Sequence, residues 1–245
     1  MTINARGESL SYRKKQTRTI LSLLKKSYPN AKIVLNYGNP WELLVAVILS
    51  AQCTDVMVNK VTSKLFAKYK RLEDYVEADV SEFEQDIKST GFYHTKAKHI
   101  LAASKLIKDT FGGLVPQTMK DILTIPGVAR KTANVVLGNA YGLVEGIAVD
   151  THVLRLSQRL RLVDLNKIGG KKVLTFVSPE RSRRVDYKKD GDPVKIEQQL
   201  MSVVPKEDWF KLTYLLIDHG RAVCKAQHPD CLHCPVEHMC PSSRI

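Results

Sequence analysis

Apolar residues recur at helical spacing through most of the chain. Those at 10–24 lie among lysines and arginines, which predicts an amphipathic N-terminal helix with a basic outer face. Residues 41–49 are apolar almost all round and follow an Asn39-Pro40 start typical of a helix N-terminus, so this helix should be central to a core. Residues 31–37 have some strand character, but no second strand follows, and we expect an extended linker.

The same spacing continues beyond this helix. Four more helices are predicted, at residues 55–65, 72–77, 80–88 and 97–111. The last of these has a basic outer face and ends at Gly112-Gly113. Residues 164–192 are weakly patterned, and we expect a loop with some internal structure there, after which Asp192-Pro193 reopens helix. The pattern therefore predicts an all-α protein.

A tight hairpin between two helices is predicted at Ile125–Ala129. Pro126 stops the first helix because proline disfavours helical geometry in the residue before it, and Gly127 can take the turn. The second helix is expected from about residue 128 to 140. Its first N–H groups have no acceptor within the helix and lie at the positive end of the helix dipole, so the hairpin predicts a phosphate-binding site.

Two residues near this hairpin carry side chains suited to catalysis. Lys131 lies in the first turn of the second helix, where the positive dipole end disfavours its ammonium form, and a neutral lysine amine is a nucleophile. Asp150 is expected to cap another helix, marked by Val153, Leu156 and Leu160. Each has an ordinary interpretation, since a lysine at a helix start is usually a solvated charge and an aspartate there is usually a cap.

Charge narrows the class of partner. The 245 residues carry 38 Lys and Arg against 25 Asp and Glu, a net charge of +13, which favours a polyanion, although a charge that serves only solubility is the alternative. The first residues lack the apolar core of a signal peptide, and the longest apolar run, Leu43–Leu49, is too short to span a bilayer. We expect a soluble, intracellular protein.

The cysteines indicate a metal site rather than a disulfide framework. Four of the five share the spacing C-x6-C-x2-C-x5-C, at Cys224, Cys231, Cys234 and Cys240. Chemistry alone allows zinc or an iron–sulfur cluster. His228, His233 and His238 lie between them, but four thiolates suffice without a histidine. An all-cysteine site has no open position for substrate and suits the fixing of a loop.

Taken together, these motifs resemble a known family. The hairpin, the run Arg-Lys-Thr-Ala-Asn at 130–134, Val-Asp-Thr-His at 149–152 and the cysteine spacing resemble the endonuclease III family of helix-hairpin-helix DNA glycosylase/lyases. The resemblance covers nearly the whole chain and leaves out only 164–192. It implies a six-helix domain at 34–143, which contains the hairpin, and a discontinuous iron–sulfur cluster domain. That domain comprises 1–33 and 144–245, with 164–192 as an atypical insertion and the DNA in a cleft between the two domains.

The resemblance also implies a reaction. A damaged pyrimidine, oxidised or ring-saturated, would be flipped out of double-stranded DNA and excised, and the abasic site would be cleaved by β-elimination. Lys131 would attack the sugar to give a Schiff base, with help from Asp150. Gln52 would fill the gap left by the flipped base and Phe92 would wedge beside the estranged one, a core aromatic being the alternative for Phe92. Further DNA contacts are expected at Ile125, Gly127, Ala129, Arg130, Thr132 and His152. Cys224, Cys231, Cys234 and Cys240 would hold a [4Fe–4S] cluster.

Two alternatives share the motifs. A helix-hairpin-helix module that binds DNA without catalysis needs neither Lys131 nor Asp150, and a mismatch-specific glycosylase usually lacks a lysine at 131. The hairpin departs from the family in having Ala129 where a second glycine often stands. The basic residues of 164–192 either extend the DNA contact or belong to a solvated loop. We expect a monomer, located in the cytoplasm with the nucleoid if the source is prokaryotic.

Overall fold

Helices dominate the fold, as predicted. The computed structural model describes residues 10–178 and 181–245, and their side chains outside 174–185. Within that part of the chain the regular structure is helical except for one two-stranded antiparallel hairpin. No described helix has the length and apolar character needed to cross a membrane.

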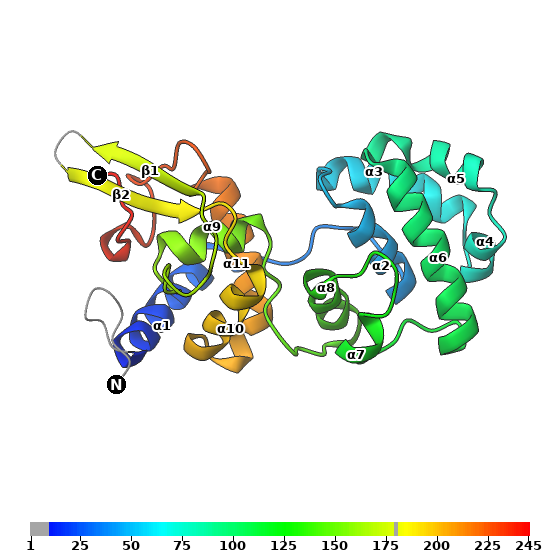
Figure 1. Cartoon of the computed structure of the whole chain (residues 1–245), viewed down its shortest axis with the longest axis horizontal. Coiled ribbons are helices and arrows are strands. Elements are labelled where there is room, and N and C mark those ends of the chain that lie inside the picture. Colours follow the sequence, from blue (N-terminus) through cyan, green and yellow to red (C-terminus); the bar gives the residue numbers. More distant parts are fainter. Residues whose placement is uncertain (1–9, 179–180) are drawn as a thin grey trace. The chain divides into compact units, whose positions relative to one another are not determined.

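The chain forms two compact units (Figure 1). One is the continuous segment Ile33–Glu145, and the other joins Met1–Lys32 to Gly146–Ile245. The predicted six-helix domain, 34–143, differs from the first unit by one residue at its start and two at its end.

The Ile33–Glu145 unit contains seven α-helices among its described residues. They are α2 (Pro40–Leu49), α3 (Asp55–Lys68), α4 (Leu72–Val76), α5 (Val80–Ile87), α6 (Tyr93–Phe111), α7 (Met119–Ile122) and α8 (Arg130–Tyr141), with a short 3₁₀ turn at Lys88–Thr90 after α5. The expected linker at 31–37 has no regular structure, which confirms that prediction.

Helix α2 is the centre of this unit. Its N-cap is Asn39, whose side-chain oxygen accepts the backbone N–H of Glu42 at 2.9 Å, and every residue from Leu43 to Leu49 is buried. The helix packs on α8, α3 and α6. An aromatic cluster of Tyr69, Tyr75 and Phe83 packs beside Trp41 at the start of α2. The prediction of a central, apolar helix is confirmed.

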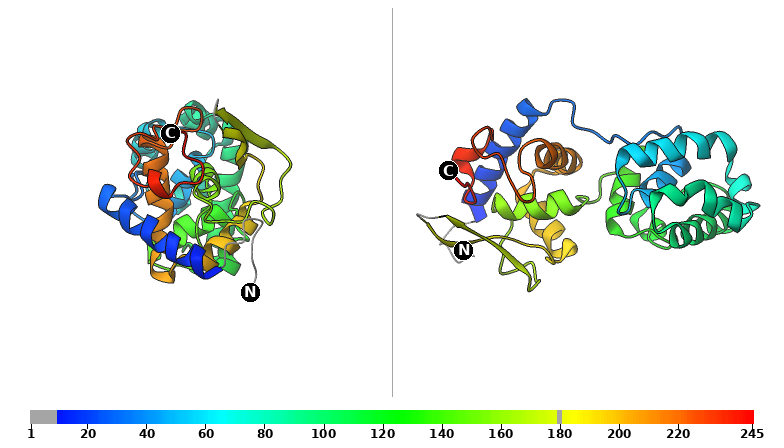
Figure 2. Two further views of the ribbon diagram at one scale, coloured as in Figure 1. Left: turned by 90° about the vertical axis from the view of Figure 1, so that its left-hand side faces the viewer. Right: turned by 90° about the horizontal axis from the view of Figure 1, so that it is seen from above.

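The second unit combines residues 10–32 with the chain from Gly146 onward. Its helices are α1 (Leu10–Ser27), α9 (Thr151–Arg159), α10 (Pro193–Val203) and α11 (Trp209–Ala222), with short 3₁₀ turns at Lys206–Asp208 and Glu237–Met239. Helix α11 packs on α9 and α1, and α10 packs on α1 and α9. The last segment of the chain, which carries the four clustered cysteines, folds back over the ends of α9 and α11 (Figure 2).

The internal structure expected at 164–192 is a β-hairpin that takes up about half of that segment. Strand β1 (Val173–Ser178) pairs antiparallel with β2 (Arg181–Lys188), from Val173 opposite Lys188 to Ser178 opposite Arg181, with two irregularities in the register. The hairpin packs on α9 through β2 (Figure 2). Valine, threonine and phenylalanine in β1 are strand formers, and packing on a helix gives a two-stranded ribbon the stability that it lacks alone.

Candidate active site and metal centre

The helix-hairpin-helix turn has the predicted geometry. The N–H of Val128 donates to the carbonyl of Ile125 at 3.1 Å, and Gly127 between them has a φ of +80°. A Cβ at Gly127 would lie 2.9 Å from the Cβ of His99 on α6, so both the left-handed backbone and the close packing require glycine. The side chain of Ile125 is buried, which leaves only its backbone for a ligand.

Ala129 replaces the second glycine without strain. Its φ of −95° and ψ of 170° are extended, a conformation that any residue adopts, and it is the N-cap of α8. The helix therefore begins at Arg130, two residues later than predicted. Ala129 has no side-chain oxygen to cap the first turn, so the turn that carries Lys131 and Thr132 keeps the positive end of the dipole. Both of these side chains are half-buried.

Asp150 is the N-cap of α9, as predicted. Its Oδ1 accepts the backbone N–H of His152 at 2.9 Å and that of Val153 at 2.8 Å. Its Oδ2 lies 2.9 Å from Nδ1 of the His152 ring. The carboxylate is 18% exposed, and these three contacts are all with residues in the first turn of α9. Gly220 on α11 lies against the His152 ring, since a Cβ there would come within 2.8 Å of Cδ2.

Gln52 and Phe92 lie in matching local geometry. Gln52 is exposed in the turn after α2, with a φ of +53°, and Phe92 is 65% exposed just before α6, with a φ of +49°. They are two of three non-glycine residues with positive φ in the described chain, a conformation that costs about 1–3 kcal/mol each and clusters at functional sites. The exposure of Phe92 excludes the alternative of a core aromatic.

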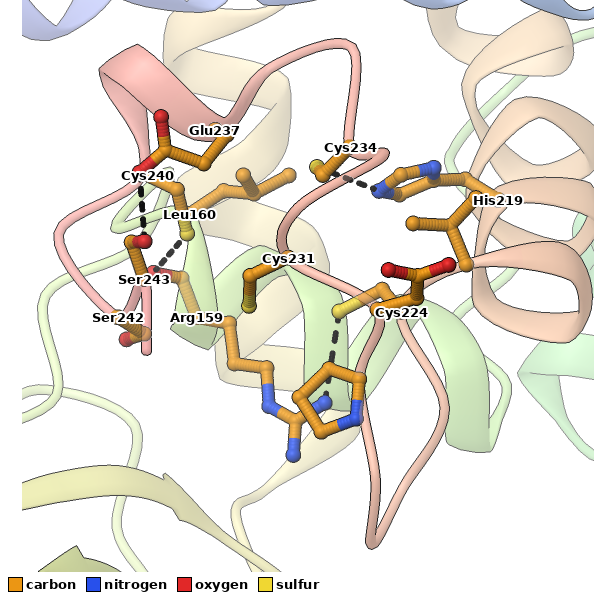
Figure 3. A pocket seen from close by; sticks show the side chains of 13 residues that line it. Arg159, Leu160, His219, Cys224, Cys231, Cys234, Glu237, Cys240, Ser242 and Ser243 are labelled. Atoms are coloured by element: carbon orange, nitrogen blue, oxygen red, sulfur yellow. Dashed lines mark hydrogen bonds between the residues drawn. The ribbon is translucent and has the colours of Figure 1, made fainter. Parts of the chain in front are cut away.

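All four clustered cysteines line one pocket (Figure 3). None of them forms a disulfide. Nη1 of Arg159 lies 3.4 Å from Sγ of Cys224, and Nε2 of His219 lies 3.7 Å from Sγ of Cys234. Neither His219 nor Arg159 was predicted: Arg159 lies 65 residues before Cys224, and His219, although close to Cys224 in the sequence, lies outside the cysteine spacing on helix α11. His219 is 1% exposed, and its Nδ1 lies 3.0 Å from the hydroxyl of Tyr28 on the segment after α1.

Burial disfavours the charged forms of three cysteines and one histidine in this pocket. It raises the pKa of Cys234 to about 11 and that of Cys240 to about 12. It also raises the pKa of Cys224, against the opposing charge of Arg159. Burial and the charge of Arg155 lower the pKa of His219 to about 4, so this imidazole is neutral at pH 7. Burial thus disfavours the thiolate forms of Cys224, Cys234 and Cys240, and a bound metal centre would supply positive charge that favours them.

Four cysteine thiols line this pocket, and chemistry allows such a donor set to hold zinc or an iron–sulfur cluster. Tetrahedral zinc with Zn–S bonds of about 2.3 Å needs sulfurs that nearly touch around it. Within residues 10–178 and 181–245, no three His, Cys, Asp or Glu side chains are placed closely enough to hold one ion. The fit of a metal centre to this pocket therefore rests on its four thiol donors.

Comparisons with known proteins identify the family. Residues 45–175 match the HhH-GPD superfamily of base excision DNA repair proteins. The chain is 45% identical to endonuclease III of Synechocystis sp., with 96% of both chains covered, and 44% identical to that of Bacillus subtilis, with 92% of both covered. It is 36% identical to endonuclease III of Escherichia coli K12, over 90% of this chain and 92% of that one.

Solved structures agree. A trapped covalent intermediate between endonuclease III and DNA, in an estranged-adenine complex, has a TM-score of 0.80 at 41% identity, with 94% of this chain and 96% of that chain covered. A thermostable thymine-DNA glycosylase, 22% identical with a TM-score of 0.73, shares the fold. The chain therefore belongs to the endonuclease III family of the HhH-GPD superfamily, and is a DNA glycosylase with abasic-site lyase activity.

Proposed function

We propose that this enzyme excises oxidised or ring-saturated pyrimidines from double-stranded DNA and cleaves the abasic site through a Schiff base on Lys131. The observation that carries the proposal is the placement of Lys131, half-buried in the first turn of the second hairpin helix, at the positive end of its dipole. The 41% identical endonuclease III that was trapped as a covalent DNA intermediate supports a covalent route.

In the proposed reaction the neutral amine of Lys131 attacks C1′ of the deoxyribose. The glycosidic bond breaks, the base leaves with its electron pair and is protonated, and ring opening gives the protonated Schiff base. This cation acidifies the C2′ proton, and its removal expels the 3′ phosphate by β-elimination. The carboxylate of Asp150 takes up a proton during the reaction and stabilises the positive charge that develops on the sugar.

Two sets of residues are proposed to bind the duplex. The hairpin offers phosphate contacts through the backbone at Ile125, Gly127 and Ala129 and through Arg130 and Thr132, and His152 adds a contact beside Asp150. The second set consists of Gln52 and Phe92, which we propose fill the gap and wedge the estranged base. Their exposure and fixed left-handed backbone support such insertion. The net charge of +13 supports a polyanionic partner.

Cys224, Cys231, Cys234 and Cys240 are proposed to hold a [4Fe–4S] cluster, since four thiols that line one pocket fit the donor set of such a cluster. When bound, such a cluster supplies four metal–thiolate bonds that fix the C-terminal loop. The residues around it then hold that loop against the ends of α9 and α11. We assign the cluster a structural role, with no step of the base excision passing through it.

Borohydride trapping tests the nucleophile. Reduction of the Schiff base should link the wild-type protein to an abasic-site duplex, and Lys131→Ala should give no adduct. Lys120→Ala, which removes an exposed lysine from the other hairpin helix, is the matched control and should trap normally. An undiminished adduct in Lys131→Ala would show that another amine is the nucleophile.

Turnover on defined lesions tests the substrate class. Duplexes with a ring-saturated thymine, an oxidised purine or a thymine–guanine mismatch should be cleaved fastest at the saturated thymine. Preference for the mismatch would favour the alternative of a mismatch-specific glycosylase. Light scattering of the protein with and without DNA checks our further proposal that it acts as a monomer. Imaging in bacterial cells checks a cytoplasmic location with the nucleoid, which the bacterial sources of its relatives support.

A further inference from the structure

Lys96 is a buried cation that the proposed reaction does not use. It lies in the first turn of α6 on the face that also carries Ala97 and Ile100, and it is 4% exposed. Burial lowers the pKa of its amine. A lysine is almost never buried without partners, so the partners of this one define its role.

The partners of Lys96 are two backbone carbonyls from different segments. Its Nζ donates to the carbonyl of Leu49 at 2.8 Å and to the carbonyl of Thr90 at 2.8 Å. Leu49 is the last residue of α2, and Thr90 is the last residue of the 3₁₀ turn that follows α5. Both residues are buried. One ammonium group therefore bonds the carbonyl ends of two helical segments, where the partial charge is negative.

Each of these carbonyls lies just ahead of an exposed residue with a left-handed backbone. Gln52 follows Leu49 by three residues, and Phe92 follows Thr90 by two. Short turns hold the chain in both places. The N–H of Cys53 donates to the carbonyl of Ser50 at 3.2 Å, and the N–H of Gly91 donates to the carbonyl of Lys88 at 3.2 Å. The positions of Gln52 and Phe92 therefore depend on where the two carbonyls are fixed.

We propose that Lys96 is a positioning residue that ties the Gln52 turn to the Phe92 turn, so that both side chains enter the duplex at a fixed separation. The inference rests on the DNA-inserting roles proposed above for Gln52 and Phe92. Two independent turns would each lose conformational freedom when DNA binds. A shared ammonium anchor fixes both before binding, and the two insertions become one cooperative event.

The test measures selectivity for a gap in the base stack. The ratio of Kd for an undamaged duplex to Kd for the same duplex with a tetrahydrofuran abasic analogue reports insertion without chemistry. Lys96→Met keeps the length of the side chain and removes its charge and donors, and it should lower the ratio about 5-fold or more, within the range of coupled neighbours. Lys105→Met, which changes an exposed lysine on the same helix, is the matched control and should keep the ratio.

A double-mutant cycle separates positioning from general destabilisation. In a Gln52→Ala/Phe92→Ala background, Lys96→Met should have no further effect on the ratio, because its effect passes through the two side chains. An equal effect in both backgrounds would overturn the inference. If Gln52→Ala/Phe92→Ala itself leaves the ratio unchanged, the proposed insertion roles fail instead, which distinguishes the two failures.

Hydrogen exchange gives a second test in the wild-type protein, should Lys96→Met fail to fold. The amides of residues 50–53 and 90–93 should exchange with one common opening free energy and should gain protection together when the abasic-analogue duplex is added. Independent exchange of the two turns, or protection of only one, would overturn the inference. Lys96→Arg, which retains the charge and the donors, should restore part of the selectivity that Lys96→Met removes.

Discussion

Arg159 and Asp186 form a buried, bidentate ion pair between α9 and β2. Nε of Arg159 lies 2.7 Å from Oδ1 of Asp186, and Nη2 lies 2.6 Å from Oδ2, with side chains only 2% and 4% exposed. The same guanidinium donates to the carbonyls of Lys225 and Ala226 and lies 3.4 Å from Sγ of Cys224. The β-hairpin and the loop at residues 224–226 therefore share the guanidinium of Arg159, and the order of each depends on the other.

Asp186→Asn should destabilise the protein strongly. It leaves the guanidinium of Arg159 buried without its counter-charge, a change that costs about 3–5 kcal/mol in buried pairs. Urea unfolding monitored by circular dichroism measures the loss, and Asp109→Asn, an exposed aspartate on α6, is the control with little expected effect. Iron content should fall as well, because Arg159 also orders the Cys224 loop. Equal stability of the two variants would contradict this role.

Two substitutions at Asp150 separate capping from chemistry. Asparagine is as good an N-cap as aspartate, so Asp150→Asn should unfold within about 0.5 kcal/mol of the wild type, whereas Asp150→Ala should lose about 0.5–2 kcal/mol. Both remove the carboxylate, and both should slow base release by about 100-fold or more in single-turnover assays. If Asp150→Asn retained the wild-type rate, Asp150 would be a cap and nothing more.

Metal analysis tests the cysteine assignment. The purified protein should contain about four irons per chain and no zinc, and Cys234→Ser should lose them together with the visible absorption of the cluster. Cys53→Ser is the matched control, because Cys53 lies in the other unit, in the turn after α2, and should retain the iron. One zinc per chain would refute the cluster, and iron loss in Cys53→Ser alone would refute the ligand set.

The features that the sequence predicts correctly depend on short-range signals. Asn39, Asp150 and Asp192 each cap a helix by accepting an N–H only two or three residues ahead, so each start can be recognised from a few residues. The helix-hairpin-helix turn is equally local, because Gly127 lies within a hydrogen bond between residues three apart, Ile125 and Val128. Such signals located both Lys131 and Asp150 on helix starts.

The features that were missed depend on partners far along the chain. Periodicity places a helical lysine or arginine on the outer face, yet Lys96 and Arg159 are buried, with partners 47 and 27 residues away. Strand β1 contains good strand formers, but its partner β2 begins Arg-Ser-Arg-Arg, and this first half lacks the apolar alternation that marks a strand. The pairing becomes stable only through α9 and the ion pair of Asp186.

Residues 171–188, in and just before the β-hairpin, carry several lysines and arginines. The ammonium of Lys188 already has a partner within the protein, since its Nζ donates to the carbonyl of Gly169 at 3.1 Å. Lys171 and Lys172 are exposed, and their backbone N–H groups are fixed by Asp190. The side chains of Arg181, Arg183 and Arg184 lie outside the described residues.

We expect some of these cations to bind phosphates beside the lesion, and the arginines are the residues to test. Each phosphate that an arginine neutralises releases counterions, so Arg181→Ala/Arg183→Ala/Arg184→Ala should reduce the slope of log K against log salt by roughly 0.9 for every such phosphate. Affinity should fall equally for damaged and undamaged duplexes, because phosphate binding reads no bases. A variant that removes the same charge elsewhere, Lys64→Ala/Lys105→Ala/Lys108→Ala, controls for net charge. An unchanged slope in the variant that lacks the three arginines would mean that these arginines are solvated. A changed lesion preference would place the β-hairpin at the base pocket.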